Sequence, residues 1–557
     1  MLKSYIKIAF RSFWRNKLFT LINLLSLSIG VSAALVIYLI VHFDFTFDKF
    51  HKDGDRIYRV VTNYTNPIAG YSSAAGSALP EVVNKQVTGI EEAAPLFALF
   101  QVDVIIPNEK IASRGFKSQH NIVYADGRYF KIFDYKWLTG SAGTALNEIN
   151  QVVLTSDQAK KYFPSLSYNQ MIGKIVMYDT LKTTITGIVQ TPVENTDLTF
   201  HDFISYNNLK TNQRLKHKLN EWEINTMLPS AQYFVKVSTG TTSSHVEKQL
   251  NNIFRKNAPD VTGKKGNSAR FHLQKLDDIH FDERYSNIYG SRIANKTTLN
   301  GLLVLATFLL LLGCINFINL STAQAARRAR EIGIRKTMGS SRNQLIFQFL
   351  SEAFFITLFA VILSVELSPI ILKSFSDFIP AGIKIDFSHQ PDVILFLIVL
   401  TIVVGLLSGF YPALVLSGYK PVTVLKNQIN SIDSKTRNAL LRKSLTVTQF
   451  IIAQFFIMAA IMVSKQIYYA LHKDLGYKKD AIIIINTPWK NRELKRQYVF
   501  MNKLRAIPQV ELVSMGDDAP SSDKINPAEA IYNDGKREIK TSVEQNTVMR
   551  IILMCIK

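Results

Sequence analysis

The chain has 557 residues, 47% of them hydrophobic, and carries a formal net charge of +22 at pH 7. This length exceeds one compact domain, and two cysteines are too few for a disulfide framework. Most of the positive charge lies in three short segments beside apolar runs, so membrane topology explains it better than nucleic-acid binding, and we expect no nucleic-acid partner.

The apolar residues gather in five long runs, each of which reaches or approaches the roughly 20 residues that a helix needs to cross a bilayer. These runs are Phe19–Phe43, Leu299–Thr322, Leu345–Leu372, Val393–Ser417 and Leu445–Val463. In a soluble protein each would be a fully buried helix, and five such runs in this length argue against that alternative. The sequence therefore predicts an α-helical membrane protein with five transmembrane helices.

Lys and Arg alternate along the chain in the way that the positive-inside rule describes. Residues 1–18, 324–344 and 418–444 hold five, six and six of them, against none, one and one acidic residue. The connection between the third and fourth runs holds two Lys against three Asp. This alternation predicts a cytoplasmic N-terminus and places residues 44–298 and the segment after Val463 outside the membrane.

Residues 1–18 precede the first predicted transmembrane helix, residues 19–43, and show a pattern of their own. Four cations recur every four residues, at Lys3, Lys7, Arg11 and Arg15. Aromatic residues gather on another side of the same helix. We expect a cytoplasmic amphipathic helix lying on anionic membrane lipids; the alternative is a simple extension of the first span.

The segment 44–298 mixes strand-like and helical stretches. Strands are expected at Gln151–Thr155, Gly173–Tyr178 and Thr183–Gln190, and a helix at Ser156–Phe163. The polar pair at residues 179–180, flanked by β-favouring residues, indicates a hairpin. The sequence therefore predicts an α+β extracytoplasmic domain.

The basic segment 324–344 joins the second and third apolar runs. The absence of Pro and Gly from Ile315 to Ile332 predicts that the second helix continues past the membrane surface, with Gly333 and Gly339 interrupting it. Residues 341–344 have the spacing of a capping box, so a new helix is expected to begin there.

The fourth apolar run contains three residues that favour close packing or bending. Gly405 and Gly409 would let a neighbouring helix approach, and Pro412 would produce a kink. We assign these three residues a structural role.

Four groups of residues resemble the FtsX/MacB-like permease family of ABC transporters, in its long two-repeat form. They are the N-terminal helix and first span with residues 47–60; residues 124–140 with 152–163 and 173–192; residues 326–345 with 349–353; and residues 409–426. Their order and spacing agree with that family over essentially the whole chain.

The resemblance implies a MacB-like periplasmic core domain at 44–298 and an FtsX-like permease domain at 299–426. It implies a permease subunit in the inner membrane that couples ATP hydrolysis by a partner ABC ATPase to movement of the outer domain, for efflux, extrusion or mechanotransmission. A second permease copy or half and a periplasmic partner are further implied partners. The implied ATPase-coupling residues are Arg327, Arg328, Arg330, Glu331, Gly333, Arg335, Lys336 and Gly339.

No pattern in the sequence indicates catalysis. The P-loop pattern G-x-x-x-x-G-K-[ST] is missing from the printed sequence, as are H-E-x-x-H and G-x-S-x-G. We therefore expect that this chain is not an enzyme and binds no cofactor or metal, with ATP and Mg²⁺ bound by the partner ATPase.

Two alternatives remain open on the residues alone. The basic segment could be a plain topology anchor, although an embedded Glu331, two glycines and a helix cap exceed what anchoring needs. The whole chain could be a membrane-anchored sensor or receptor whose outer domain binds a ligand, although the three inner segments leave little room for an output module.

The C-terminal part resembles the N-terminal part. Arg15–Leu18 opens the first span and Arg442–Leu445 opens the fifth, with similar residues following each span at similar distances. We interpret 427–465 as a cytoplasmic linker with the fifth transmembrane helix, and 466–557 as the start of a second, incomplete extracytoplasmic domain in an apparently truncated chain.

Overall fold

The computed structural model divides into two compact units, residues 1–45 with 295–472 and residues 46–294 with 473–557. The residues it describes are 11, 13–15, 17–66, 70–76, 78–107, 114–211, 222, 231–258, 268–285, 292–380, 382–387, 390–418, 432–474, 483–485, 494–516, 527–533 and 538–544. The amphipathic helix predicted for residues 1–18 falls largely outside the described residues.

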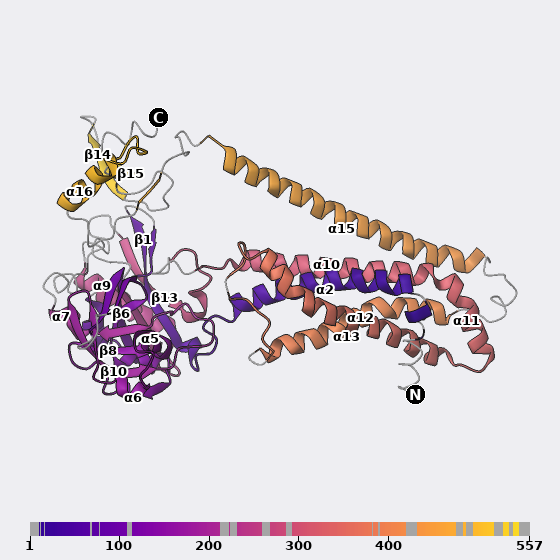
Figure 1. Ribbon diagram of the computed structural model, residues 1–557, viewed down its shortest axis with the longest axis horizontal. Helices are drawn as coiled ribbons and strands as arrows, with labels where there is room; N and C mark the ends of the chain where they lie inside the picture. Colours follow the sequence, from indigo (N-terminus) through magenta and orange to yellow (C-terminus); the bar gives the residue numbers. More distant parts are fainter. Residues whose placement is uncertain are drawn as a thin grey trace. The chain divides into compact units, whose positions relative to one another are not determined.

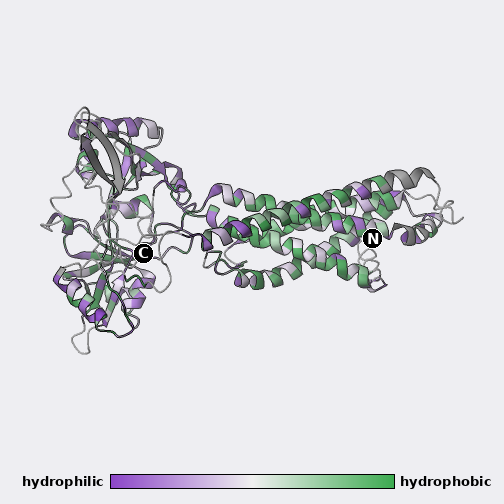
Figure 2. Cartoon of the chain, turned by 90° about the horizontal axis from the view of Figure 1, so that it is seen from above, coloured by the Kyte–Doolittle hydropathy of each residue, from purple (hydrophilic) through white to green (hydrophobic). Residues whose placement is uncertain are grey.

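The first unit is a bundle of long helices (Figure 1). They are α2 (Lys17–Phe45), α10 (Lys296–Ala323), α11 (Ala325–Thr337), α12 (Arg342–Ser374), α13 (Pro391–Ser417) and α15 (Ile432–His472). All except the short α11 are long and apolar enough to cross a membrane, as the sequence predicted. Figure 2 shows hydrophobic residues along most of their length. The described part of the chain is thus an α-helical membrane protein with five candidate spans.

Helix α2 lies at the centre of the bundle. In the most apolar 18-residue stretch of each helix, 61% of the α2 residues are buried but none of the α15 residues are. Helix α2 therefore packs against other helices, whereas α15 is exposed along this stretch. A Cβ at Gly30 would lie 3.1 Å from the carbonyl oxygen of Leu309 on α10. The Ser364 hydroxyl on α12 donates a 3.0 Å hydrogen bond to the Ser28 carbonyl. Small residues and interhelical hydrogen bonds of this kind hold helices together in lipid, where the hydrophobic effect does not.

The second unit contains a 13-stranded mixed sheet, and we refer to residues 46–294 as the α+β domain. The strands are β1 (Ile57–Asn66), β2 (Gly70–Ser72), β3 (Ile90–Leu99), β4 (Val102–Ile106), β5 (Arg114–Gln119), β6 (Ile122–Ala125), β7 (Trp137–Thr139), β8 (Gln151–Thr155), β9 (Ile175–Tyr178), β10 (Leu181–Val189), β11 (Asp202–Ser205), β12 (Ala231–Val237) and β13 (Ser268–Lys275). Their order is β13-β1-β12-β3-β6-β11-β8-β10-β9-β4-β5, with β2 on β1 and β7 on β10. The pairs β8–β10 and β6–β11 are parallel and the others are antiparallel.

Helices lie before, between and after these strands in the chain. They are η1 (Gly54–Arg56), α3 (Leu79–Gln86), α4 (Gly127–Ile132), α5 (Ser156–Tyr162), α6 (Tyr168–Met171), α7 (Asn207–Thr211), α9 (Ser243–Asn257) and η3 (Leu276–Asp278). The α+β class, the strand at Gln151–Thr155 and the helix after it agree with the sequence prediction. The predicted hairpin is also present, and Asp179 adopts the left-handed φ of 56° that a tight turn requires.

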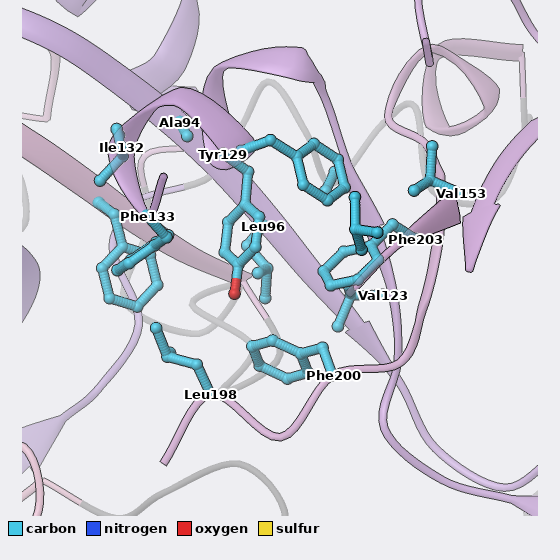
Figure 3. Close-up of a cluster of buried hydrophobic side chains, with 14 of the residues drawn as sticks. Ala94, Leu96, Val123, Tyr129, Ile132, Phe133, Val153, Leu198, Phe200 and Phe203 are labelled. Carbon is cyan, nitrogen blue, oxygen red and sulfur yellow. The ribbon is translucent and has the colours of Figure 1, made fainter. Parts of the chain in front are cut away.

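Aromatic side chains dominate one core of the α+β domain (Figure 3). Tyr129 and Phe133 on and after α4 have ring centroids 4.7 Å apart, and Phe203 of β11 lies 5.3 Å from Tyr129. Helix α4 approaches so closely at Gly127 that a Cβ there would lie 2.2 Å from the carbonyl oxygen of Ala142. Offset and edge-on rings add to the free energy that burial provides. After α15 the described residues form α16 (Leu494–Arg505) and a hairpin of β14 (Pro527–Asn533) and β15 (Glu538–Glu544).

One prediction is wrong in detail. The second span was expected to continue unbroken to Ile332, but α10 ends at Ala323 and a turn at Gln324 separates it from α11. Gly333 does not interrupt the chain either, because it is buried within α11. The break at Gln324 thus occurs in a stretch that contains neither proline nor glycine.

Candidate functional site at the basic connecting segment

Helix α11 lies between the ends of α10 and α12 and is fixed by one apolar face. Ile332 is 2% exposed and packs in a cluster with Leu345, Phe349, Ala413 and Leu416, from α12 and α13. This cluster attaches the connecting segment to two candidate spans besides α10. A displacement of α11 must therefore displace the adjoining ends of α12 and α13.

The turn between α11 and α12 has a defined geometry. The Gly339 amide donates to the Lys336 carbonyl at 3.1 Å, and the Ser340 amide donates to the Arg335 carbonyl at 3.0 Å. Together with the positive φ of 95° at Gly339, this is a Schellman motif, which satisfies the last carbonyls of a helix. The next helix begins at once, because Ser341 and Gln344 form the predicted capping box.

A buried ion pair links α11 to α12. The Arg328 guanidinium donates to Glu352 Oε2 at 2.9 Å, and these side chains are 19% and 8% exposed. Glu352 Oε1 accepts a second bond from Gln348 Nε2 at 3.1 Å. Arg328 also lies over the rings of Phe19 and Phe349, with its guanidinium carbon 5.7 and 6.0 Å from their centroids. Arg328 thus contacts both the Glu352 carboxylate on α12 and the Phe19 ring on α2.

A second set of polar contacts extends this ion pair along α11. Arg335 donates to Gln348 Oε1 at 2.6 Å and to Glu331 Oε1 at 2.5 Å. The other oxygen of Glu331 accepts from Arg15, which precedes α2. We call the set Arg15, Arg328, Glu331, Arg335, Gln348 and Glu352 the polar network. It connects α11 and α12, which follow each other in the chain, to the segment before α2, where Arg15 lies 316 positions from Glu331 in the sequence.

Lys336 completes the attachment of α11 on its α13 side. Its ammonium donates to the Ser417 carbonyl at 2.7 Å, at the last residue of α13. A cation there is favoured by the partial negative charge at a helix C-terminus. Burial lowers the pKa of Lys336 from its ordinary value, and the positive charge of Arg342 lowers it further by a smaller amount.

A cavity of about 30 Å³ adjoins the Arg328–Glu352 pair. Its lining comes from the segment before α2 and from α2, α10, α11, α12 and α13: Phe13, Phe19, Thr20, Phe317, Ser321, Arg328, Phe349, Glu352, Ala353, Ile356, Gly409, Pro412 and Leu416. This volume holds about one water molecule, so the cavity is a packing defect beside the network and no ligand pocket.

Gly409 and Gly405 lie where α13 crosses α12. A Cβ on Gly409 would come within 2.7 Å of the Ala353 Cβ, and one on Gly405 within 3.5 Å of the Phe354 Cα. Pro412 is buried within α13 and lines the cavity. The tight contact at Gly409 shows that these helices approach each other at van der Waals distance beside the polar network.

The face of α11 that is not packed carries two apolar residues. Ile334 is 46% exposed and Met338 is 82% exposed, four residues apart and hence on one side of the helix. The backbones of Arg327 and Arg330 lie in α11, but their side chains are outside the described residues. Of the residues predicted to couple to an ATPase, Arg328, Glu331, Arg335 and Lys336 thus bind other residues of the bundle.

Sequence reasoning missed several participants in this site. Gln348 and Glu352, one turn apart on α12, were given no role in the sequence analysis. Nothing indicated Arg15, the Ser417 carbonyl or the exposed pair Ile334 and Met338. The described residues include no group of three His, Cys, Asp or Glu side chains that could hold a metal ion.

Two family models match the chain. One describes the FtsX-like permease C-terminal and matches residues 303–421, and the other describes the MacB-like periplasmic core domain and matches residues 20–253. The helices with the connecting segment and the α+β domain therefore define the class as a membrane permease with a periplasmic-type domain between its first two spans.

Curated relatives agree with this class. The macrolide export ATP-binding/permease protein MacB of Campylobacter jejuni is 25% identical over 290 residues, which cover 51% of this chain and 40% of that protein. The protein of the same name from Pasteurella multocida is 22% identical over 438 residues, covering 76% and 60%. The chain thus spans 40% and 60% of the length of these two relatives, less than two thirds in each case. Among solved structures, the periplasmic region of MacB from Actinobacillus actinomycetemcomitans matches 42% of this chain and 94% of its own, with 16% identity and a TM-score of 0.29.

The chain belongs to the MacB/FtsX-like family of ABC transporter permeases.

Proposed function

We propose that this chain is the permease subunit of an ABC transporter in the inner membrane, and that α11 with the turn after it is the site where a partner ATPase binds in the cytoplasm. The α+β domain would then lie in the periplasm. ATP and Mg²⁺ would bind to the partner, since the printed sequence has no P-loop pattern.

The observation that carries the proposal is the division of α11 into a packed face and an exposed face. Ile332 and the polar network hold one face to α12, α13 and the segment before α2. Ile334 and Met338 project from the other face. Exposed apolar side chains on a basic helix suit insertion into a cleft of another protein better than a role in topology alone.

Force applied to α11 would reach the bundle through these contacts. Arg328 and Arg335 bind α12, Lys336 binds the end of α13, and Arg15 reaches the segment before α2. Helices α2 and α10 continue covalently into the α+β domain. Hydrolysis in the partner could thus move the domain for efflux, extrusion or mechanotransmission, with α11 as the driven element.

Co-purification with an ABC ATPase tests the proposal. The full-length protein carrying Ile334→Glu and Met338→Glu is purified beside the wild type from mild-detergent extracts of native membranes, and ABC ATPases are quantified by mass spectrometry. We expect the wild type to retain an ATPase that the double variant loses. Val193→Glu is the matched control, because Val193 is 73% exposed in the α+β domain. Equal recovery with the double variant would show that α11 is not the binding site.

Orientation is tested separately by thiol labelling. Met338→Cys and, in another variant, Val193→Cys are introduced into a Cys555→Ser background, and intact cells with a permeabilised outer membrane receive an inner-membrane-impermeant maleimide. Cys314 is buried and stays as it is. We expect labelling at position 193 and none at position 338 until the inner membrane is opened. Labelling at 338 in intact cells would contradict the cytoplasmic placement of α11.

A further inference from the structure

The two edge strands of the large sheet, β13 and β5, differ in whether other residues cover their outer backbone groups. At one edge, side chains of α9 bind the outward backbone of β13: Asn251 exchanges two 2.9 Å hydrogen bonds with the main chain of Phe271, and Glu247 accepts from the Leu273 amide at 3.0 Å. These contacts occupy the groups that another strand would use. Covering an edge in this way prevents unwanted strand pairing.

The opposite edge, β5, has no such cover among the described residues. Its one strand neighbour there is β4, with Ile105 opposite Gly115 and Ile106 opposite Arg114. Four of its six residues are exposed, and the other two are partly exposed. The Lys117 carbonyl accepts a 2.8 Å hydrogen bond from the partly exposed Gln119 side chain, which a partner strand can displace. In an antiparallel pair, alternate residues direct their N–H and C=O groups outward, so β5 presents an open edge.

The open edge is basic and aromatic. The Arg114 guanidinium lies 5.0 Å from the centroid of the Phe116 ring, and the Lys161 ammonium of α5 lies 5.5 Å from the same ring. Lys161 also donates to Gln119 Oε1 at 2.9 Å. Lys117 is exposed on the strand itself. Asp103 of β4 places a carboxylate near this edge, where it accepts a 2.9 Å hydrogen bond from the Ser118 amide.

We propose that β5 is a docking strand for an extended acidic segment of a protein partner, which adds to the sheet edge as a further strand. Six residues of β5 offer an edge of about 20 Å, enough to pair with a segment of similar length. Carboxylates at alternate positions of that segment would face Arg114 and Lys161, which lie on one face of the strand beside Phe116. The backbone edge selects a peptide, and the charge selects an acidic one. This inference does not depend on the proposed ATPase site.

The test measures binding of two fluorescent octapeptides to the full-length protein in nanodiscs made of zwitterionic lipid. The first alternates Glu and Val. The second has the same sequence with alternate backbone nitrogens methylated, so that it keeps its charge but cannot pair as a strand. We expect the first to bind and the second to bind at least about tenfold more weakly, as the loss of a few backbone hydrogen bonds predicts.

Charge reversals identify the surface. Arg114→Glu combined with Lys161→Glu is expected to weaken binding of the first peptide about tenfold, because two partly exposed ionic contacts are lost. Lys182→Glu is the matched control and should stay within about twofold, since exposed Lys182 lies on β10, an interior strand paired on both sides. Unchanged thermal unfolding verifies that each variant folds. The proposal is overturned if no peptide binds at millimolar concentration, if methylation has no effect, which would indicate a general polyanion surface, or if the control weakens binding as much as the double variant.

Discussion

The buried pair Arg328–Glu352 gives the sharpest prediction about how α11 is held. Arg328→Met removes the cation and Glu352→Leu removes the anion, while the double variant removes both and leaves apolar side chains of similar size. Each single variant leaves one charge without its partner in a place where the side chains are only 19% and 8% exposed. The effect on stability therefore depends on whether the other partner is still present.

The expected size follows from the burial of the pair. Stranding one member of a buried ion pair costs about 3–5 kcal/mol. Arg328 keeps some contact with solvent and with two aromatic rings, which reduces the penalty for Glu352→Leu to about 2–3 kcal/mol. Arg328→Met leaves Glu352 with the Gln348 amide as its remaining bond and should cost about 3 kcal/mol. The double variant should lie within about 1–2 kcal/mol of the wild type, because no charge is left uncompensated.

The assay is a double-mutant cycle on the purified full-length protein, unfolded by SDS in mixed micelles and followed by helix content. We expect the double variant to be more stable than either single variant, with a coupling of about 2 kcal/mol or more. If the single effects are below about 1 kcal/mol and simply add, the pair does not hold α11 to α12.

Three further perturbations have defined outcomes. Gly409→Leu should destabilise the bundle by about 1–3 kcal/mol in the same SDS assay, because the larger side chain overpacks the contact with α12. Gly301→Ala is the control and should have little effect, since a Cβ there would meet no atom within 4 Å. Equal effects of the two variants would contradict the close helix contact at Gly409. Ser341→Ala should cost about 1 kcal/mol by removing the capping box of α12, and a neutral result would show that packing alone sets this helix start. The hydrogen bond to Glu247 raises the pKa of His272, so its stabilising effect is complete below the unfolded pKa near 6.5 and is lost as pH rises through the raised pKa. Both groups are partly exposed, so thermal unfolding of the α+β domain in the whole protein should reveal a loss of no more than about 0.5 kcal/mol from pH 6 to 9, which His272→Gln removes; an unchanged slope in that variant would refute the assignment.

The sequence was sufficient for everything that depends on local pattern. The five candidate spans are confirmed because a membrane-length apolar run has few alternatives to a transmembrane helix. The Ser341 capping box and the turn at Asp179 are also present where they were predicted, since each needs only a few neighbouring residues. Local chemistry determines such features before any tertiary contact forms.

Tertiary structure decided what the basic segment does inside the bundle. Five of its cations, Arg327, Arg328, Arg330, Arg335 and Lys336, were predicted together as ATPase-coupling residues, and in the structure Arg328, Arg335 and Lys336 bind α12 and α13. The pairing of Arg15 with Glu331 joins residues 316 positions apart, and no spacing rule reaches that far. Which side of a short helix is packed and which is exposed depends on the helices that approach it, so a charge pattern alone could not separate the residues that hold α11 from those that it presents.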